Sequence, residues 1–214
     1  MDQHQALWRE KIAGEVIANL EKRNMEGSFA ATAAQARAEI LAMIPEKAVV
    51  YRGGSMSTVA LELWPAISAL PAVAVIDPYR AGLSPKESAA ARRQGLVADL
   101  MIASCNAVTL DGRLVNLDGR GNRIAAMTFG PHKIILVVGL NKVVPDLDTA
   151  MARIKFEAAP TNAMRLGLAT PCATTGRCAD CQSLQRICNM WSIIEGHAVK
   201  GRIHVKLVGE SLGY

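Results

Sequence analysis

Short apolar runs separated by helical stretches are the feature that most constrains the fold of this chain. The expected strands are 48–51 (AVVY), 72–77 (AVAVID), 99–104 (DLMIAS), 133–139 (KIILVVG) and 203–210 (IHVKLVGE). The expected helices between them are 56–68, 84–95 and 146–158. Strands that are apolar along their whole length are typical of parallel sheets covered on both faces. The sequence therefore predicts an α/β fold with a mainly parallel sheet flanked by helices.

Residues 1–45 are predicted to form an N-terminal helical segment ahead of this sheet. Apolar side chains recur at helical spacing over 5–23, and Thr32 caps a second helix that stops before Pro45. The length of 214 residues suits one core, and no repeat or low-complexity linker divides the chain. We expect a single domain over 1–214.

Composition and charge narrow the class of ligand. The net charge of +5 fits anionic small molecules or acidic partners. Lysines and arginines are scattered and only three Phe and three Tyr occur, so we expect no nucleic-acid partner. No segment has the roughly 18 uncharged apolar residues of a membrane span. The start, MDQHQALWREKI, lacks the apolar region of a signal peptide, so we expect a cytoplasmic protein that does not enter a membrane.

Two loops that follow or adjoin predicted strands carry groups suited to an anion. In RGGSMS (52–57), Gly53 and Gly54 allow a tight turn, and the helix that starts after Ser55 offers free N–H groups beside Arg52. In VVGLNK (138–143), the candidate residues are Gly139, Asn141 and Lys142. Lys142 would polarise or deprotonate a ligand if it is desolvated. An ordinary strand-to-helix turn and a solvated loop lysine are the alternatives.

A third loop, NLDGRGNRIA (116–125), follows a hairpin that its Asp-Gly turn predicts over 107–117. The candidate ligand-contacting residues of this loop are Asn116, Gly119, Gly121 and Asn122. Asp118 and Arg123 are its candidate catalytic residues, and Arg123 would clamp a carboxylate or phosphate with two hydrogen bonds. A well-capped surface loop is the alternative. Because parallel strands bind ligands at their carboxyl ends, the three loops are predicted to meet around one anion-binding pocket.

Four of the five cysteines lie close together near the C-terminus. Cys172, Cys178, Cys181 and Cys188 have the spacing C-x5-C-x2-C-x6-C within a polar, glycine-containing stretch. Four thiolates are a complete ligand set for zinc or for a 4Fe-4S cluster, and thiolate softness does not separate the two. Disulfides and plain core packing are the alternatives. Residues 170–190 are thus predicted to be a Cys-rich, metal-binding insertion, with Cys105 a buried bystander.

Two long stretches carry a resemblance to a known family. LDGRLVNLDGRGNRIAAMTFGPHKIILVVGLNKVV and APTNAMRLGLATPCATTGRCADCQSLQRICN, together with GGS at 53–55 and the terminal LVGESLGY, resemble the lactate-utilisation (LUD) domain family. The resemblance runs from about residue 5 to the end and is strongest to the branch with a C-terminal cysteine cluster. It implies a fold like that of sugar-phosphate isomerases and CoA-transferases. Relatives encoded with iron–sulfur subunits take part in oxidising L-lactate to pyruvate.

Three functions compete on these grounds. The first is an enzyme or enzyme subunit acting on a small anionic metabolite, such as a hydroxy or keto acid or a sugar phosphate. The second is a non-catalytic, metal-stabilised module that docks on iron–sulfur redox subunits. The third is a metabolite sensor. The relatives' iron–sulfur partners favour a 4Fe-4S cluster over zinc, and the sequence leaves the oligomeric state open, a homodimer included.

Overall fold

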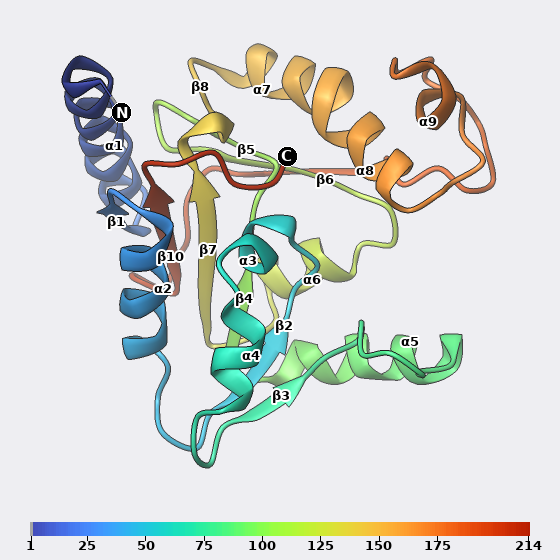
Figure 1. Ribbon diagram of the computed structural model, residues 1–214, viewed down its shortest axis with the longest axis horizontal. Helices are drawn as coiled ribbons and strands as arrows, with labels where there is room; N and C mark the ends of the chain where they lie inside the picture. Colours follow the sequence, from blue (N-terminus) through green and yellow to red (C-terminus); the bar gives the residue numbers. More distant parts are fainter. Residues whose placement is uncertain (1) are drawn as a thin grey trace.

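The computed structural model describes residues 2–214, and a six-stranded sheet forms its centre (Figure 1). The strands of this sheet are β1 (Glu26–Ala30), β2 (Val49–Arg52), β3 (Ala74–Ile76), β4 (Leu100–Ala103), β7 (Lys133–Gly139) and β10 (Ile203–Val208). Their order is β1-β10-β7-β4-β2-β3, and every neighbouring pair runs parallel. The mainly parallel sheet that the apolar runs predict is confirmed.

Helices cover both faces of this sheet, which explains why its central strands are apolar throughout. The helices are α1 (Gln3–Lys22), α2 (Ala33–Ala42), α3 (Met56–Ala60), α4 (Leu63–Ser68), α5 (Pro85–Gln94) and α6 (Asn122–Thr128). On β7, Ile134, Leu136 and Val138 pack with buried side chains of α1 and α6. Ile135 and Val137 pack with those of α2 and α4. Successive side chains of a strand point to opposite faces, so each face needs its own apolar set.

A smaller, four-stranded sheet lies beyond the carboxyl ends of these strands (Figure 1). Its strands are β5 (Ala107–Thr109), β6 (Leu114–Asp118), β8 (Val143–Val144) and β9 (Met190–Ile194), in the order β8-β5-β6-β9. β5 and β6 form the antiparallel hairpin predicted from the Asp-Gly turn, in which Gly112 has a φ of 86°. The helical elements beside this sheet are α7 (Leu147–Arg153), a π-helical turn (Ile154–Ala158), α8 (Ala159–Arg165) and α9 (Pro171–Thr175).

The N-terminal segment differs from its prediction. Residues 1–45 were expected to be helical, but they also contain β1, between α1 and α2. β1 is an edge strand that pairs only with β10, and only Ala30 of its five residues is fully buried. A strand that is covered so little needs no continuous apolar run, so its sequence lacks the signal that marks the central strands.

Two predicted helices have different bounds. The helix expected over 56–68 is interrupted at Glu62, whose φ is 50°, and this break separates α3 from α4. It allows the indole N–H of Trp64 to donate to Thr58 Oγ1 at 3.1 Å. The helix expected over 146–158 continues through the π-helical turn as far as Arg165.

The cysteine-rich stretch 170–190 is not a separate structural unit. It consists of the short helix α9 and irregular chain that runs into β9. None of the helices within residues 2–214 is long and apolar enough to cross a membrane.

Candidate functional site

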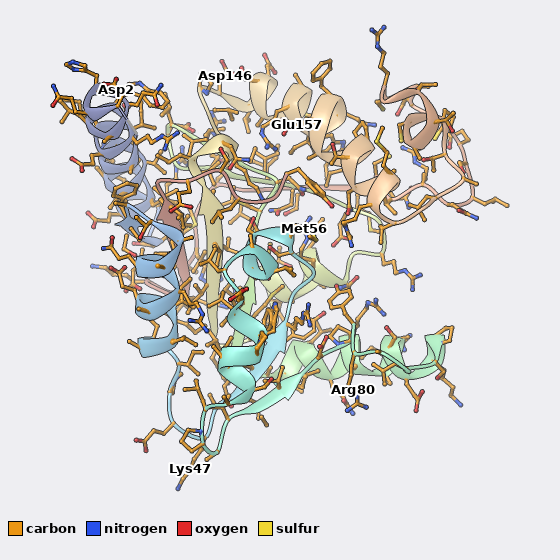
Figure 2. The ribbon with its side chains drawn as sticks, in the orientation of Figure 1. Asp2, Lys47, Met56, Arg80, Asp146 and Glu157 are labelled. Atoms are coloured by element: carbon orange, nitrogen blue, oxygen red, sulfur yellow. The ribbon has the colours of Figure 1, made fainter. Side chains whose placement is uncertain are left out.

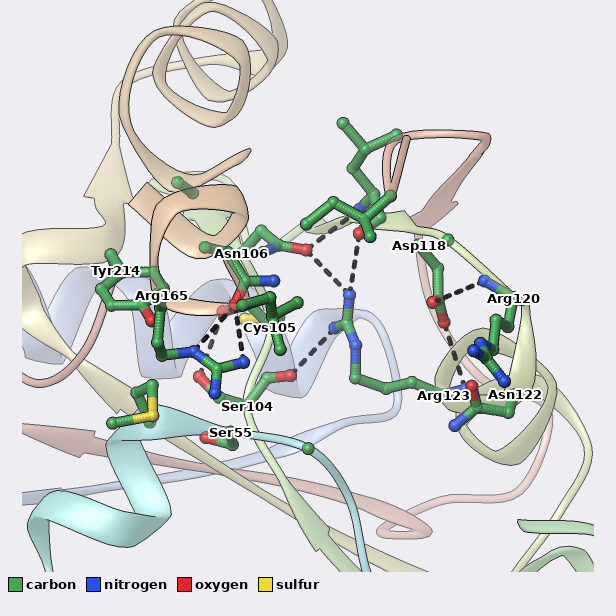
Figure 3. A pocket seen from close by; sticks show the side chains of 18 of the residues that line it. Ser55, Ser104, Cys105, Asn106, Asp118, Arg120, Asn122, Arg123, Arg165 and Tyr214 are labelled. Carbon is green, nitrogen blue, oxygen red and sulfur yellow. Dashed lines mark hydrogen bonds between the residues drawn. The ribbon is translucent and has the colours of Figure 1, made fainter. Parts of the chain in front are cut away.

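A pocket of about 480 Å³ opens at the carboxyl ends of the parallel strands, between the large sheet and the α7–α8 segment (Figure 3). Residues that follow β2, β3, β4 and β7 line it, as does Tyr214 from the tail after β10. Met56, at the first position of α3, belongs to the side of the large sheet, and Ala158 and Asn162 belong to the opposite side. Figure 2 shows Met56 below the helical segment that carries Glu157. Open α/β sheets place ligand sites at this end of the strands.

The structure brings the three predicted loops together around this pocket. The predicted site residues that line it are Gly54, Ser55, Asp118, Gly119, Asn122, Arg123 and Lys142. The other predicted ligand-contacting residues, Gly53, Asn116, Gly121, Gly139 and Asn141, are not part of its lining. Asn141 instead holds the C-terminal tail: its Nδ2 donates to the Gly213 carbonyl at 3.1 Å and its Oδ1 accepts from the Leu212 amide at 3.1 Å.

Lys142 is a buried lysine at the pocket wall. It ends the 3-10 turn Leu140–Lys142 directly after β7, and only 2% of its surface is exposed. Its Nζ donates to Ser57 Oγ at 2.8 Å and to Ser104 Oγ at 3.1 Å. Burial lowers the pKa of Lys142 to about 8, because the charged form loses hydration that two hydroxyl groups replace only in part.

Arg123 lines the pocket, but its guanidinium is committed to protein acceptors. Nη1 donates to the Ser104 carbonyl at 3.1 Å and to Asn116 Oδ1 at 2.6 Å. Nη2 donates to Asn106 Oδ1 at 2.9 Å and to the Leu117 carbonyl at 3.1 Å. This head group is predicted from the sequence to clamp an anion. In the structure it joins the end of β4 to β6, so its four bonds hold the pocket wall together.

Asp118 is likewise occupied by the fold. One carboxylate oxygen accepts from the backbone N–H of Arg120 at 3.4 Å, and the other accepts from those of Arg123 at 3.1 Å and Ile124 at 3.2 Å. These N–H groups belong to the turn that starts α6, so the carboxylate caps this turn and favours its geometry. Figure 3 shows the contacts of Asp118 with Arg120 and Arg123 beside the pocket.

Four further arginines line the pocket and differ in their partners. Arg52 forms an ion pair with Asp77 at 2.8 Å and lies 5.1 Å from the Trp64 ring centre. Arg92, Arg120 and Arg165 have no ion pair with a carboxylate among residues 2–214. The cationic residues of the lining are Arg52, Arg92, Arg120, Arg123, Lys142 and Arg165, and its single acidic residue is Asp118.

Sequence reasoning missed several residues of this site. Ser57 and Ser104 hold Lys142, and both have a position that could have pointed to them: Ser57 lies in the first turn of the helix after β2, and Ser104 follows β4. Arg92, Arg165 and Tyr214 reach the pocket from α5, α8 and the C-terminal tail. Arg92 and Arg165 lie on helices far from any strand end in the sequence, and Tyr214 follows β10 in a tail that carries no basic residue, so no local pattern marks the three.

The four clustered cysteines do not form a metal site as they are arranged. No group of three or more His, Cys, Asp or Glu side chains within residues 2–214 is placed to hold a metal ion. All four thiols are free and partly buried, and the Cys172 sulfur lies 3.3 Å from Thr170 Oγ1. The residues present therefore do not fit a four-cysteine metal centre in this arrangement.

The cysteine-rich segment nevertheless contacts the pocket. Ile187 is part of the lining. Asn189 donates its backbone N–H to the Asp118 carbonyl at 2.9 Å and its side-chain amide to the Gly119 carbonyl at 3.0 Å. A Cβ atom on Gly119 would lie 3.1 Å from the Ile187 Cα, so this glycine permits the close approach. The segment thus packs on the loop that carries Asp118.

Comparison with solved structures supports the fold. The crystal structure of a DUF162 family protein from Deinococcus radiodurans is similar, with a TM-score of 0.52 and 17% identity over 94% of this chain and 98% of that chain. Ribose 5-phosphate isomerase from Plasmodium falciparum (TM-score 0.35, 17% identity, 51% of each chain) is more distant. So is eIF2B delta from Chaetomium thermophilum (TM-score 0.34, 14% identity, 67% of this chain and 55% of that one).

Comparison with curated protein sequences gave no match. The LUD domain, by contrast, matches residues 13–208, which include every strand of both sheets and every residue of the pocket except Tyr214. DUF162 is the former name of this family. The match covers far more than half of the chain, and the protein belongs to the LUD domain family.

Proposed function

We propose that the pocket binds a small anionic metabolite, a hydroxy or keto acid or a sugar phosphate, and that the protein is an enzyme or enzyme subunit acting on it. The observation that carries this proposal is the charge of the lining, in which six cationic side chains face one carboxylate. A pocket of about 480 Å³ suits a ligand of this size.

The charged side chains that remain for a ligand are those that other protein groups do not already bond or neutralise. Asp118 is occupied by three backbone N–H groups, and Arg123 by four protein acceptors. Arg52 is neutralised by Asp77. Arg92, Arg120 and Arg165 thus supply the uncompensated positive charge at the pocket. Guanidinium groups bind carboxylates and phosphates with paired hydrogen bonds, so these three arginines are the expected contacts for the anion.

Lys142 supplies the reactive group in this proposal. It lies at the pocket wall, away from bulk water, and a lysine with a lowered pKa can donate a proton to a bound ligand or remove one near neutral pH. Ser57 and Ser104 fix the position of its nitrogen. The anion would be held by arginines on other elements, which orients the ligand relative to Lys142.

Calorimetric titration with pairs of similar ligands, one anionic and one neutral, tests the proposal. L-Lactate, pyruvate and ribose 5-phosphate should bind, and their neutral counterparts glycerol, acetone and ribose should not. Binding should weaken as the salt concentration rises, because the contacts are electrostatic. Equal affinity for the neutral compounds, or no binding of any anion of the panel, would contradict the proposal.

A further inference from the structure

We propose that the ligand of this pocket carries a carbonyl group and that Lys142 Nζ forms an imine with its carbon. This inference rests on the proposed anion binding and extends it to a reaction and a substrate class. It starts from the way in which the two serines hold the lysine nitrogen.

Both serine hydroxyls accept hydrogen bonds from Lys142. Ser57 Oγ lies 3.0 Å from the Leu212 carbonyl oxygen, and Ser104 Oγ lies 3.1 Å from that of Cys105. A carbonyl oxygen can only accept, so each hydroxyl proton has a carbonyl acceptor, with Ser104 Oγ at 3.4 Å as a second acceptor for Ser57. Each hydroxyl oxygen is thereby left to accept from Nζ. Neither serine is therefore placed to donate to the lone pair of a neutral amine.

The third position on Nζ has no protein partner within residues 2–214. An ammonium group has three donors, and the two serines take two of them. Lys142 is part of the pocket lining, so the remaining position is available to a ligand. When the amine is neutral, its two N–H groups can stay on the serines and its lone pair occupies that third position.

Burial favours loss of the Lys142 proton, and the charges around it act on its pKa in both directions. The charged or titratable groups that act on it are Cys105, Arg123, Arg153 and Glu157. Arg123 and Arg153 lower its pKa, whereas Cys105 and Glu157 raise it, and burial is the largest effect. With a pKa of about 8, about one molecule in ten has a neutral amine at pH 7.

The arrangement of charge and amine selects the substrate class. Arginines such as Arg120 and Arg165 can hold a carboxylate or phosphate while Lys142 meets a second group of the same molecule. A neutral amine reacts with an aldehyde or ketone carbon. The expected substrates are therefore 2-oxo acids or aldehydes and ketones that bear a phosphate.

The reaction is a condensation that releases water. The Nζ lone pair adds to the carbonyl carbon, and one proton passes from the nitrogen to the former carbonyl oxygen to give a neutral carbinolamine. The C–O bond then breaks, the hydroxyl group leaves as water with the second proton from the nitrogen, and a neutral C=N bond joins ligand and lysine. Sodium cyanoborohydride, added as the reductant, transfers hydride to the imine carbon, and a solvent proton completes the secondary amine.

Reductive trapping tests the inference on the full chain. The protein is incubated with cyanoborohydride and either pyruvate or glyceraldehyde 3-phosphate, which separate the carboxylate and phosphate forms of the substrate class. L-Lactate and glycerol 3-phosphate serve as controls of matching charge that lack the carbonyl. Intact mass and peptide mapping then report the adduct and its position, and calorimetry on the same samples reports binding.

We expect one adduct per chain with at least one carbonyl probe, mapped to Lys142, and none with lactate or glycerol 3-phosphate. Lys142→Met and Lys142→Arg should lose this adduct, while Lys155→Met should retain it. Trapping in the wild type should become faster from pH 6 to pH 8, as the neutral amine increases. Circular dichroism checks that the variants fold, and the peptide map of the wild type does not depend on their folding.

Two outcomes would overturn the inference. If the carbonyl probes bind by calorimetry but leave Lys142 unmodified, the imine is excluded and the proposed anion binding stands. If adducts are spread evenly over surface lysines, with no excess at Lys142, the lysine has no special reactivity. Absence of binding by every anionic probe is a different result, because it rejects the proposed function itself.

Discussion

The strand-end pocket and the cysteine-rich segment both gather side chains capable of chemistry, and each contains an arginine that binds backbone carbonyls. Arg123 of the pocket donates to the Ser104 carbonyl and to the side-chain oxygen of Asn106, 19 and 17 residues away in the sequence. Arg186 of the cysteine-rich segment bonds to the carbonyls of Cys181 and Cys188, 5 and 2 residues away. The first arginine connects separate elements of the fold, whereas the second only shapes its own loop.

This difference explains why one region is a formed site and the other is not. The pocket residues start from strand ends whose positions the parallel sheet determines, and buried hydrogen bonds then fix Lys142 and Arg123. Cys172 lies in the short helix α9 and the other three cysteines lie on irregular chain; all four are only partly buried, and no sheet pairing sets their separation. A metal ion would have to supply the organisation that the sheet supplies at the pocket.

The metal centre stays a prediction. Finding a metal there would alter the comparison between the pocket and the cysteine-rich segment more than any other result. If the four cysteines with the spacing C-x5-C-x2-C-x6-C bind zinc or a 4Fe-4S cluster, the segment must rearrange around the metal. Its side chains would then be fixed as firmly as those of the pocket. Protein purified without oxygen should then contain metal, most of which Cys178→Ser loses, because each thiolate is one of only four ligands. Cys105→Ser is the matched control and should retain it, since Cys105 lies outside the segment.

Metal analysis with absorption spectroscopy gives the result directly. Brown, absorbing protein indicates a cluster, and colourless protein with stoichiometric zinc indicates zinc. A metal content that is the same in wild type and Cys178→Ser would refute the centre and leave the contrast between the two regions as the structure shows it.

Replacing Arg123 and Arg186 should show that the two regions contribute differently to the free energy of unfolding. Arg123→Met leaves acceptors on Ser104, Asn106, Asn116 and Leu117 without their donor, so we expect a loss of about 4 kcal/mol in the free energy of unfolding. Arg186→Met opens a loop that carries little of the core, so a loss of about 1 kcal/mol is expected. Urea unfolding measures both, and equal losses would show that Arg123 is no more important to the fold than Arg186.

The buried lysine of the pocket predicts a pH dependence of stability. Its pKa is about 8 in the folded protein and 10.5 in the unfolded chain, so the unfolded chain binds more protons between these values. The contribution of Lys142 to the free energy of unfolding therefore rises with pH, by about 3 kcal/mol from pH 8 to pH 10.5. The measurement is the difference between wild type and Lys142→Met below pH 9, where the thiol of Cys105, whose pKa burial raises, stays protonated in the folded protein. A difference that stays constant with pH would show that Lys142 is not desolvated.

The parts of the fold that can be predicted from the sequence are those whose interactions require a recognisable local pattern of residues. Strands such as β4 and β7 are recognisable because both of their faces are buried, and the loops with Ser55, Asp118 and Lys142 follow from the strand ends. The edge strand β1 is only partly buried, and most of β9 in the small sheet is exposed. Neither therefore has the continuous apolar run that marks β4 and β7.

The role of a charged residue is harder to read from sequence than its position. Arg123 and Arg165 both reach the pocket, but their partners come from chain segments that only the tertiary fold brings near. The sequence favoured Arg123 because it lies in a glycine-rich loop. The folded chain shows its guanidinium bonded to four protein acceptors, whereas that of Arg165 donates to the side chain of Asn162, on its own helix.

A glycine at the end of β7 tests how tightly the pocket is built. A Cβ atom on Gly139 would lie 2.6 Å from the Leu212 amide nitrogen and 2.7 Å from the Glu210 carbonyl oxygen, so the tail that holds Ser57 would have to move. Gly139→Ala should cost about 2 kcal/mol in the free energy of unfolding. Gly14→Ala, in α1, meets no atom within 4 Å and should instead add up to about 1 kcal/mol. Thermal or urea unfolding compares them, and equal effects would argue against a close fit at Gly139.

Replacement of Arg165, which lines the pocket, gives the most direct test of the central claim. This claim is that uncompensated arginines around the strand ends bind a small anion. Arg165→Met removes an exposed guanidinium that lines the pocket, and Arg93→Met removes one from α5 that does not. Calorimetric titration with pyruvate and ribose 5-phosphate should show binding to Arg165→Met weakened about tenfold, the equivalent of about 1.4 kcal/mol for one charged hydrogen-bonding group. Binding to Arg93→Met should match the wild type. Equal affinities in all three proteins, or an equal loss in both variants, would contradict the assignment of this pocket as the anion site.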